Sequence, residues 1–287
     1  MNIAVVYNTN SGSEDSLADI KQAFQTHNVE PTYVPIDRID DKLPSLLRRP
    51  HLTVVAAGGD GTINSVVGHI IDTDATLAVI PSGTLNHFAR ELGIPLETAD
   101  AVKVALGNTQ TQVDIGIVNG HVFLNNSSIG WYPRSLRARE ELDSHIGKWP
   151  AALVGSLKAA LNPRRYHVEL TIDGKHVAYR TPFVFIGNNS YKRANPNIGQ
   201  RETLQGGQLA IYIVKAQNFV GILRMLAVGL FTKKRRTQDF ATYKASECII
   251  STRHHRTLHV ACDGEVLDLP VPLNYRSKPS SLRVLIP

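Results

Sequence analysis

The first third of the chain alternates short apolar runs with longer amphipathic stretches. Strand-like runs lie at 3–7, 31–35, 53–57 and 77–80, and stretches with helical periodicity lie at 16–27, 41–47, 62–71, 85–92 and 99–106. This alternation predicts a parallel sheet covered by helices on both faces, a doubly wound α/β arrangement. Polar loops at 8–13, 58–62 and 81–84 each follow a strand. We therefore expect these loops to meet at the carboxyl edge of the sheet, where such sheets bind ligands.

The pattern changes after residue 114. Strand-like runs lie at 115–118, 122–129, 168–172, 182–186, 208–214, 248–252, 257–261 and 281–286, with a helical stretch at 132–161 between them. Asp173-Gly174 separates two alternating runs and indicates a β-hairpin. We expect two domains: an α/β nucleotide-binding domain at 1–114, and a β-rich domain at 115–287, built as a sandwich or a barrel-like sheet.

A glycine-rich turn at 58–64, Gly-Gly-Asp-Gly-Thr-Ile-Asn, joins an apolar strand to an amphipathic helix. Glycines let the backbone approach a ligand closely, and free N–H groups before a helix N-terminus form an anion cradle. A carboxylate repels bare phosphate, so Asp60 indicates a bound Mg²⁺ or a proton transfer. The alternative is a tight turn in which Asp60 only caps a helix.

Two further motifs carry polar groups. The loop Pro-Ser-Gly-Thr-Leu-Asn at 81–86 offers Gly83 for a sharp exit from the strand, and Thr84 and Asn86 for capping or for a phosphate or ribose. Near the C-terminus, Asp263 and Glu265 flank a glycine, so the pair could hold a metal or accept a proton. An ordinary Asp-Gly hairpin turn is the alternative for this second motif.

Composition narrows the picture only a little. The chain has 287 residues and a net charge of +6, which fits nucleic acid, an anionic bilayer or acidic small molecules. Its two cysteines, Cys248 and Cys262, imply no disulfide framework, and with nearby histidines they match no standard zinc spacing. The longest apolar run, 219–231, is too short to span a bilayer. The cluster Lys-Lys-Arg-Arg at 233–236 follows this run. The segment therefore has two interpretations, a helix that rests on an anionic membrane or a buried helix with a basic end.

Neither a P-loop nor a dinucleotide fingerprint is present in the sequence. The three motifs at 58–64, 81–89 and 263–265 instead resemble the diacylglycerol-kinase catalytic-domain family, which includes bacterial soluble lipid kinases and sphingosine and ceramide kinases. Val-Asp-Ile-Gly at 113–116, followed by Val-Phe-Leu-Asn at 122–125, resembles the family's crossover into its second domain. The first motif alone is shared with NAD kinases and, more loosely, with phosphofructokinases.

The resemblance implies an N-terminal α/β domain like that of NAD kinases and phosphofructokinases, a C-terminal β-sandwich domain, and a site in the cleft. It implies that Glu265 accepts a proton and that Asp60 and Asp263 organise Mg²⁺ and phosphates. The residues expected to bind ATP are Asn8, Ser11, Gly12, Gly58, Gly59, Asp60, Gly61, Thr62, Asn64, Gly83, Thr84 and Asn86.

The chain departs from the family's pattern at three places. The first loop, Asn-Thr-Asn-Ser-Gly at 8–12, lacks the family's proline. Gly-Gly-Gln-Leu at 206–209 stands where relatives often carry Asp-Gly-x-Leu, so the carboxylate of an accessory Mg²⁺ site is missing. Trp131-Tyr132 stands where relatives often carry Phe-Asp, which bears on the acceptor pocket.

We therefore expect an ATP-dependent lipid kinase with ATP and Mg²⁺ as cofactors, Glu265, Asp263 and Asp60 as catalytic residues, and Asp60 and Asp263 as metal ligands. The expected partner is a lipid substrate at the membrane surface and not a nucleic acid. The expected location is the cytoplasm, with peripheral contact at the inner membrane face and a homodimer left open. An NAD kinase and a non-catalytic nucleotide- or lipid-binding relative are the alternatives. The acceptor lipid stays open among diacylglycerol, phosphatidylglycerol, a sphingoid base and ceramide.

Overall fold

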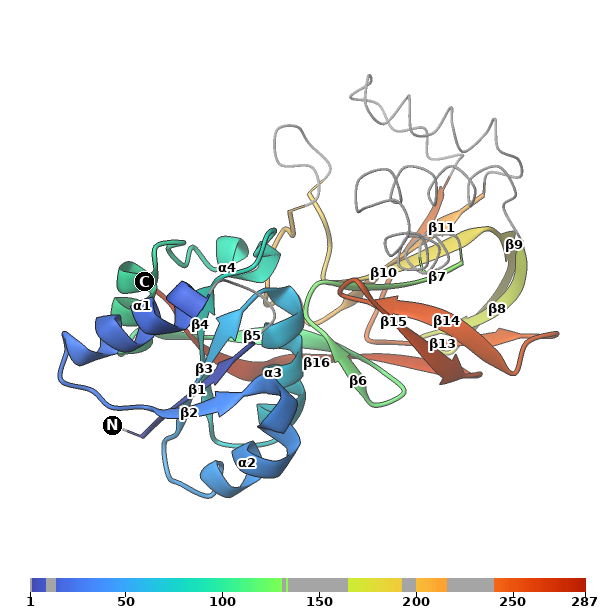
Figure 1. Ribbon diagram of the computed structural model, residues 1–287. Helices are drawn as coiled ribbons and strands as arrows, with labels where there is room; N and C mark the ends of the chain where they lie inside the picture. Colours follow the sequence, from blue (N-terminus) through green and yellow to red (C-terminus); the bar gives the residue numbers. More distant parts are fainter. Residues whose placement is uncertain (1, 9–13, 131–132, 134–164, 193–199, 216–239) are drawn as a thin grey trace, which may run out of the picture. The chain divides into compact units, whose positions relative to one another are not determined.

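A computed structural model of the protein describes residues 2–8, 14–130, 133, 165–192, 200–215 and 240–287 (Figure 1). The chain divides into two units, the first comprising Met1–Ile115 with Lys278–Pro287 and the second comprising Gly116–Ser277. The chain first passes from the first unit into the second after residue 115, one residue after the predicted boundary at 114. The last ten residues differ from the predicted division, because they pack with the first unit and not with the β-rich one.

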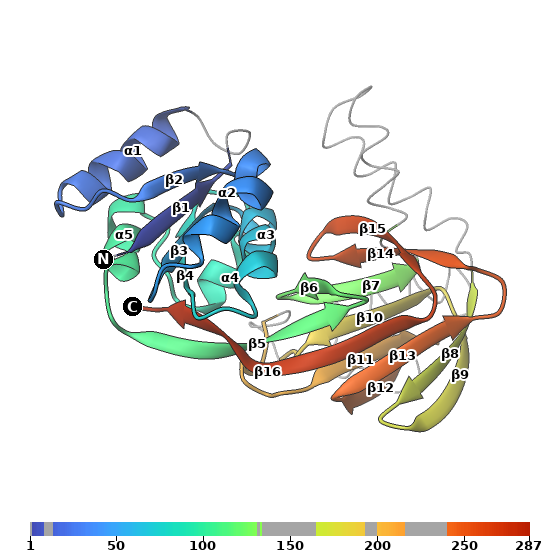
Figure 2. The same ribbon diagram turned by 90° about the horizontal axis from the view of Figure 1, so that it is seen from below.

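The first unit is built on a parallel sheet in the strand order β2, β1, β3, β4. Its strands are β1 (Ile3–Tyr7), β2 (Thr32–Pro35), β3 (Thr53–Gly58) and β4 (Thr76–Pro81). Its helices are α1 (Glu14–Gln25), η1 (Ile36–Arg38), α2 (Ile39–Leu46), α3 (Asp60–Ile70), α4 (His87–Glu91) and α5 (Thr98–Ala105). Helix α1 packs with α5, and α2 packs with α3, with the two pairs on opposite faces of the sheet (Figure 2). The predicted parallel α/β domain is confirmed.

Burial explains why these runs form the centre of a sheet. All six residues of β3, and five of the six in β4, are buried, as expected for parallel strands covered on both faces. Helices α3 and α5 turn apolar stripes toward the strands, with Ile63, Val67 and Val102 fully buried. The sheet therefore forms a rigid base whose carboxyl edge carries the motif loops.

The C-terminal segment completes the first unit. The last part of β16 (Leu273–Leu285) pairs in parallel with β4 through Val284 and Leu77. The carboxylate of Asp114, which is 1% exposed, accepts the backbone N–H of Ser280 at 2.8 Å. Ion pairs from Lys278 and Arg283 reach carboxylates in the turn before β4. These contacts explain why the last ten residues belong to the first unit.

The second unit is a β-sandwich. One sheet has the order β12, β11, β10, β7, β14, β15, and the other contains β9, β8, β13 and the first part of β16. The bounds are β5 (Gln110–Val118), β6 (His121–Phe123), β7 (Asn126–Gly130), β8 (Tyr166–Ile172), β9 (Lys175–Thr181), β10 (Phe183–Asn188), β11 (Leu209–Val214), β12 (Phe240–Ala245), β13 (Glu247–Thr252), β14 (Thr257–Cys262) and β15 (Glu265–Pro270). Apolar side chains of both sheets form a single buried core. The predicted β-sandwich is confirmed.

One predicted strand was wrong. The run 122–129 is split into β6 and β7, because the N–H groups of Leu124 and Asn125 leave the ladder and donate to Asp263. Strands β12 and β15 were not predicted, and only the end of β16 was predicted. The helical stretch at 132–161 and the apolar run with its basic cluster at 219–236 lie outside the described residues.

Candidate active site

The two motif loops of the first unit meet at the carboxyl edge of the parallel sheet. Gly58 at the end of β3 is in register with Pro81 at the end of β4, and Ser82 donates its N–H to the Gly58 carbonyl at 3.1 Å. A β-carbon on Gly83 would lie only 2.5 Å from Cα of Gly59. Glycine is therefore required here by close approach of two backbones, and the loops form one continuous surface.

Asp60 joins the two loops. It is the first residue of α3, and its two carboxylate oxygens accept the N–H groups of His87 and Phe88 at 3.1 Å each. These donors open helix α4, so Asp60 caps a helix that begins 27 residues later in the sequence. Asp60 therefore caps a helix, as the capping interpretation expected, but the helix that it caps is α4 and not α3, which it begins.

Several predicted nucleotide-binding residues shape the loops from within. Asn86 is 6% exposed, has a φ of 50°, and exchanges two hydrogen bonds with Gly83, at 3.0 and 2.8 Å. The Thr62 side chain is buried and fills the space where Gly58 lacks a β-carbon. Both residues therefore hold the backbone in shape, whereas Thr84 of the same loop is exposed.

The remaining predicted residues of this unit lie along the same edge. Asn8 directly follows β1 and is half-buried, Gly61 is exposed in the first turn of α3, and Asn64 is half-buried one turn on. Ser11 and Gly12 lie outside the described residues. Helix α3 has Gly59 at its N-cap with no side-chain cap, so its first N–H groups and the helix dipole favour an anion.

The acidic motif of the second unit is a two-residue β-hairpin. Cys262 and Glu265 pair across the turn, and Asp263 and Gly264 have φ values of 47° and 94°. Positive φ at both central positions is the geometry of a type I′ turn, which Asp-Gly favours. The hairpin interpretation of this motif is thus correct for its backbone, and the question becomes what its two carboxylates do.

The Asp263 carboxylate is occupied by backbone donors. It accepts the N–H groups of Leu124 at 2.6 Å and of Asn125 and Asn126 at 2.9 Å each, and the Asp263 N–H returns to the Asn126 carbonyl at 2.9 Å. Burial raises the pKa of Asp263 to about 6, although these three N–H donors and the nearby Arg201 guanidinium act to lower it. Asp263 therefore ties the hairpin to the break between β6 and β7.

Glu265 differs from Asp263 in its surroundings. It is the first residue of β15, immediately after the turn, and its side chain is exposed to solvent. A solvent-accessible carboxylate on a fixed hairpin can reach a substrate hydroxyl and accept its proton. The two acids thus have separate roles in the described structure: Asp263 fixes the turn, and Glu265 is presented by it.

A count of acceptor sites separates the two predicted metal ligands. An ionised carboxylate offers about four lone-pair positions. Asp60 uses two of them for N–H donors, whereas Asp263 uses three. Mg²⁺ usually takes one or two protein carboxylates and fills its other positions with water and phosphate oxygens. Asp60 therefore fits a role beside Mg·ATP, and Asp263 is already nearly saturated.

The accessory Mg²⁺ site does not fit this chain. Gly206 carries no carboxylate, and a β-carbon there would lie 2.6 Å from Oδ1 of Asn189. Within the ranges that the structure describes, no three or more His, Cys, Asp and Glu side chains gather as a metal site would require. The structure adds a set of polar residues around the acidic turn, namely Asn125, Asn188, Tyr191 and Arg201, of which only Asn125 belongs to a sequence motif.

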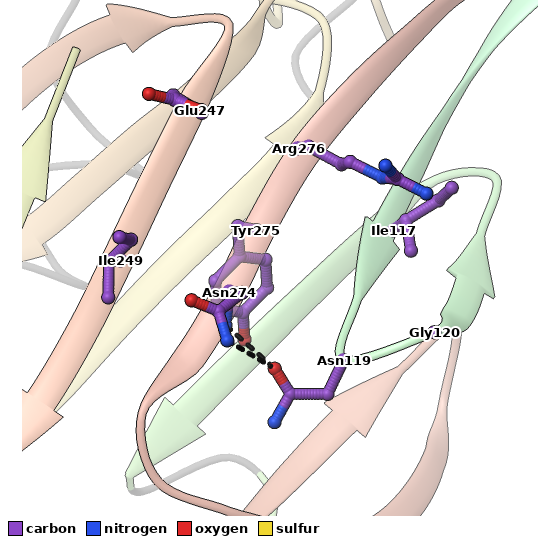
Figure 3. Close-up of a pocket in the computed structure, with 8 residues that line it drawn as sticks. All are labelled: Ile117, Asn119, Gly120, Glu247, Ile249, Asn274, Tyr275 and Arg276. Carbon is purple, nitrogen blue, oxygen red and sulfur yellow. Dashed lines mark hydrogen bonds between the residues drawn. The ribbon is translucent and has the colours of Figure 1, made fainter.

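A shallow hollow of about 260 Å³ lies elsewhere in the second unit. Figure 3 shows Tyr275 and Asn274 of β16 between Ile249 of β13 and the turn at Asn119, where Asn274 donates to the Asn119 side chain. None of its eight lining residues is a predicted site residue. The predicted residues thus fall into two groups, the glycine loops of the first unit and the acidic hairpin of the second.

Comparison with known proteins assigns both units. Residues 2–118 match the family model of the diacylglycerol kinase catalytic domain, and residues 139–286 match the YegS C-terminal NAD kinase beta sandwich-like domain. The chain is 29% identical over 275 residues to a diacylglycerol kinase of Bacillus subtilis, covering 91% of this chain and 88% of the relative. A diacylglycerol kinase of Staphylococcus aureus is 26% identical over 272 residues, covering 91% and 85%.

A solved structure agrees in fold. A diacylglycerol kinase from Bacillus anthracis superposes with a TM-score of 0.70 at 20% identity, covering 100% of this chain and 97% of that one. The α/β unit and the β-sandwich unit described above correspond to these two matched domains. The chain belongs to the diacylglycerol-kinase catalytic-domain family, and at that level it is a kinase. None of the described helices is both long and apolar enough to cross a membrane.

Proposed function

We propose that this protein transfers the γ-phosphoryl group of Mg·ATP to the hydroxyl of a lipid of the diacylglycerol type. The observation that carries the proposal is the joined pair of glycine loops at the N-terminus of α3, held together by Asp60. Membership of the diacylglycerol-kinase family and the names of the relatives support a glycerolipid acceptor.

Phosphoryl transfer depends mainly on positioning and on neutralisation of charge. The N–H groups at 59–62 bind phosphate oxygens, and the close contact of Gly59 with Gly83 keeps side chains out of their way. Asp60 has two acceptor positions left for the nucleotide's Mg²⁺. Bound Mg²⁺ supplies charge neutralisation on the β- and γ-phosphates.

Glu265 accepts the proton of the lipid hydroxyl as the hydroxyl oxygen attacks the γ-phosphorus, while the bond from that phosphorus to the bridging oxygen breaks and ADP leaves. Its exposure at the start of β15 leaves it accessible to a substrate, and the Asp263-Gly264 turn fixes the backbone before it. The proposal requires the γ-phosphoryl group seated on the glycine loops to come within reach of Glu265.

The lipid acceptor implies a membrane contact. We propose a cytoplasmic protein that touches the inner membrane face peripherally, as a monomer or a homodimer. The basic cluster at 233–236 is our candidate for this contact, although it lies outside the described residues. Neutralising its four basic residues should weaken binding to anionic vesicles, and unchanged binding would exclude the cluster.

The function is tested with γ-labelled ATP and Mg²⁺ in three parallel reactions, containing total membrane lipid extract, NAD, or no acceptor. The expected result is label in one lipid class, whose identification names the acceptor. Label in NAD would replace the proposal by an NAD kinase. ATP binding without transfer to any acceptor would make the protein a non-catalytic nucleotide-binding relative.

A further inference from the structure

The break between β6 and β7 is held from two sides. On one side, the three successive N–H groups of Leu124, Asn125 and Asn126 all donate to the carboxylate of Asp263. On the other side, the carbonyl oxygens of Leu124 and Asn125 accept hydrogen bonds from polar side chains. Because the N–H groups of Leu124 and Asn125 donate to this carboxylate, they do not continue a β-ladder, and β7 begins only at Asn126.

Arg201 is the charged group on that second side. It is 5% exposed, and its guanidinium donates through Nη1 to the Leu124 carbonyl and through Nη2 to Oδ1 of Asn125 at 3.3 Å. Asn188 Nδ2 donates to the Leu124 carbonyl at 2.8 Å, and the Tyr191 hydroxyl donates to the Asn125 carbonyl at 2.9 Å. Arg201 thus contributes a positive charge to a cluster that also includes Asn125, Asn188, Tyr191 and Asp263.

A carboxylate with little access to water needs a compensating positive charge or several hydrogen bonds. The Asp263 carboxylate has both, because its three N–H donors are supplemented by the Arg201 guanidinium, whose charge acts to lower the pKa of Asp263. Gly206, at the position where the resemblance implies the carboxylate of an accessory Mg²⁺, has no side chain to bind such an ion. An arginine can supply the positive charge that a metal would otherwise supply.

We propose that Arg201 is a positioning residue, the internal cation that holds the segment 124–126 against Asp263 and so fixes the turn that presents Glu265, without a divalent ion. This inference rests on the proposed function, because Arg201 affects lipid phosphorylation only if Glu265 is the proton acceptor. Arg201 itself touches neither substrate nor nucleotide in this proposal.

The chain offers a matched control in its other Asp-Gly hairpin. Asp173 and Gly174 have φ values of 42° and 80°, and Ile172 pairs with Lys175 across them. The Asp173 carboxylate accepts the N–H groups of Ser246 and Glu247 at 3.1 Å each and the Ser246 hydroxyl at 3.0 Å. This second turn has the same geometry and the same kind of donors, but its next residue is Lys175 where the first has Glu265.

Each turn also has a buried cysteine beside it. Cys262 immediately precedes Asp263, and Cys248 follows the Ser246–Glu247 donors of Asp173 by one residue. A buried thiol reacts only when its surroundings open, so its rate of alkylation reports the local stability of its turn. Both thiols belong to the same buried core, so general unfolding exposes both, whereas a change in the labelling of one thiol alone reports its own hairpin.

The test compares full-length wild type, Arg201→Met, Arg201→Lys and the control Asp173→Asn. A hydrogen bond to a charged group is worth about 10- to 100-fold in an opening equilibrium. We expect Arg201→Met to speed iodoacetamide labelling of Cys262 by that factor and to leave Cys248 unchanged, and Asp173→Asn to do the reverse. The kcat for lipid phosphorylation should fall in Arg201→Met with an unchanged KM for ATP, and Arg201→Lys should recover part of both effects.

Either of two results would overturn the proposal. In the first, Arg201→Met has both the Cys262 labelling rate and the kcat of the wild type. In the second, the wild type without nucleotide melts at a higher temperature in Mg²⁺ than in EDTA. If Arg201→Met does not fold, Arg201→Gln, which keeps amide donors without charge, replaces it with the same expectation. The labelling experiment does not depend on turnover. If Arg201→Met exposes Cys262 selectively but the wild type phosphorylates no acceptor, the positioning role of Arg201 is supported and the proposed kinase function is rejected.

Discussion

Gly59 and Gly83 lie backbone against backbone, so that a β-carbon added to Gly83 would stand 2.5 Å from Cα of Gly59 and 2.9 Å from Oδ1 of Asn86. The two glycines come from different motifs, 24 residues apart in the sequence, and their contact turns two loops into one surface. The arrangement explains why both motifs need glycine at this position, and it makes the loops depend on one another.

Gly83→Ala should therefore damage both the fold and the nucleotide seat. Overpacking typically destabilises by about 1–3 kcal/mol, and we expect a loss in this range together with weaker ATP binding. Gly68→Ala is the control, because a β-carbon there meets nothing within 4 Å, and it should stabilise helix α3 by about 0.5–1 kcal/mol. Urea denaturation and calorimetric titration with ATP measure the two effects. Wild-type ATP affinity in Gly83→Ala would contradict the account.

Asp60→Asn separates capping from metal binding. The asparagine oxygen can accept one of the N–H groups of His87 and Phe88, but the asparagine amide then turns its own N–H donor toward the second of these N–H groups. We expect the free energy of unfolding to fall by about 1 kcal/mol. If Asp60 also assists Mg²⁺, the affinity for ATP should fall in Mg²⁺ and change little in EDTA.

Asp100→Asn is the control for Asp60, since Asp100 is exposed and pairs only with Lys103 among the interactions that the described residues show. It should leave both the stability and the ATP affinity close to the wild-type values. Equal losses of ATP affinity in Mg²⁺ and in EDTA for Asp60→Asn would reduce Asp60 to a helix cap.

Ionisation of buried thiols and tyrosine hydroxyls should lower the stability of the protein at alkaline pH. Burial raises the pKa of Cys248 and of Cys262 to about 12, and burial with a hydrogen bond to Tyr243 raises the pKa of Tyr179 to about 12. The ordinary values are 9.0 and 10.0, so the unfolded chain loses these protons first. Their contribution is complete below those values and is lost as the pH rises toward about 12. The urea midpoint should therefore fall above about pH 9.

Tyr179→Phe checks the cause of that alkaline loss. Phenylalanine does not ionise, so the decline of the urea midpoint above about pH 10 should become shallower than in the wild type. An identical decline in the two proteins would mean that Tyr179 does not contribute to it.

Local patterns were sufficient for much of the fold. The parallel sheet, its order of elements along the chain and the meeting of the loops at 58–62 and 81–84 follow from apolar runs such as 53–57 and 77–80, which are β-prone and end at glycine or proline. The Asp-Gly signals at 173 and 263 correctly indicate hairpins, because positive φ at two successive residues is a local requirement.

Long-range contacts could not be read from the sequence. Asp60 caps a helix 27 residues away, and Asp263 breaks a predicted strand by binding N–H groups 137 to 139 residues away. Arg201 belongs to no motif, and its burial depends on partners that lie 76 and 77 residues earlier. Only the tertiary structure shows that Asp263, a predicted metal ligand, binds backbone N–H groups, and that Arg201 binds the same segment from its other side.

The most direct test of the account is the kcat of Glu265→Gln for lipid phosphorylation, measured beside its affinity for ATP. Loss of a general base usually lowers turnover by about 10²–10⁴-fold, and we predict a fall of at least about 100-fold with unchanged ATP affinity. Asp268→Asn removes an exposed carboxylate from the same strand and should retain wild-type turnover. Near wild-type kcat in Glu265→Gln would contradict the assignment of the acidic hairpin to the chemistry.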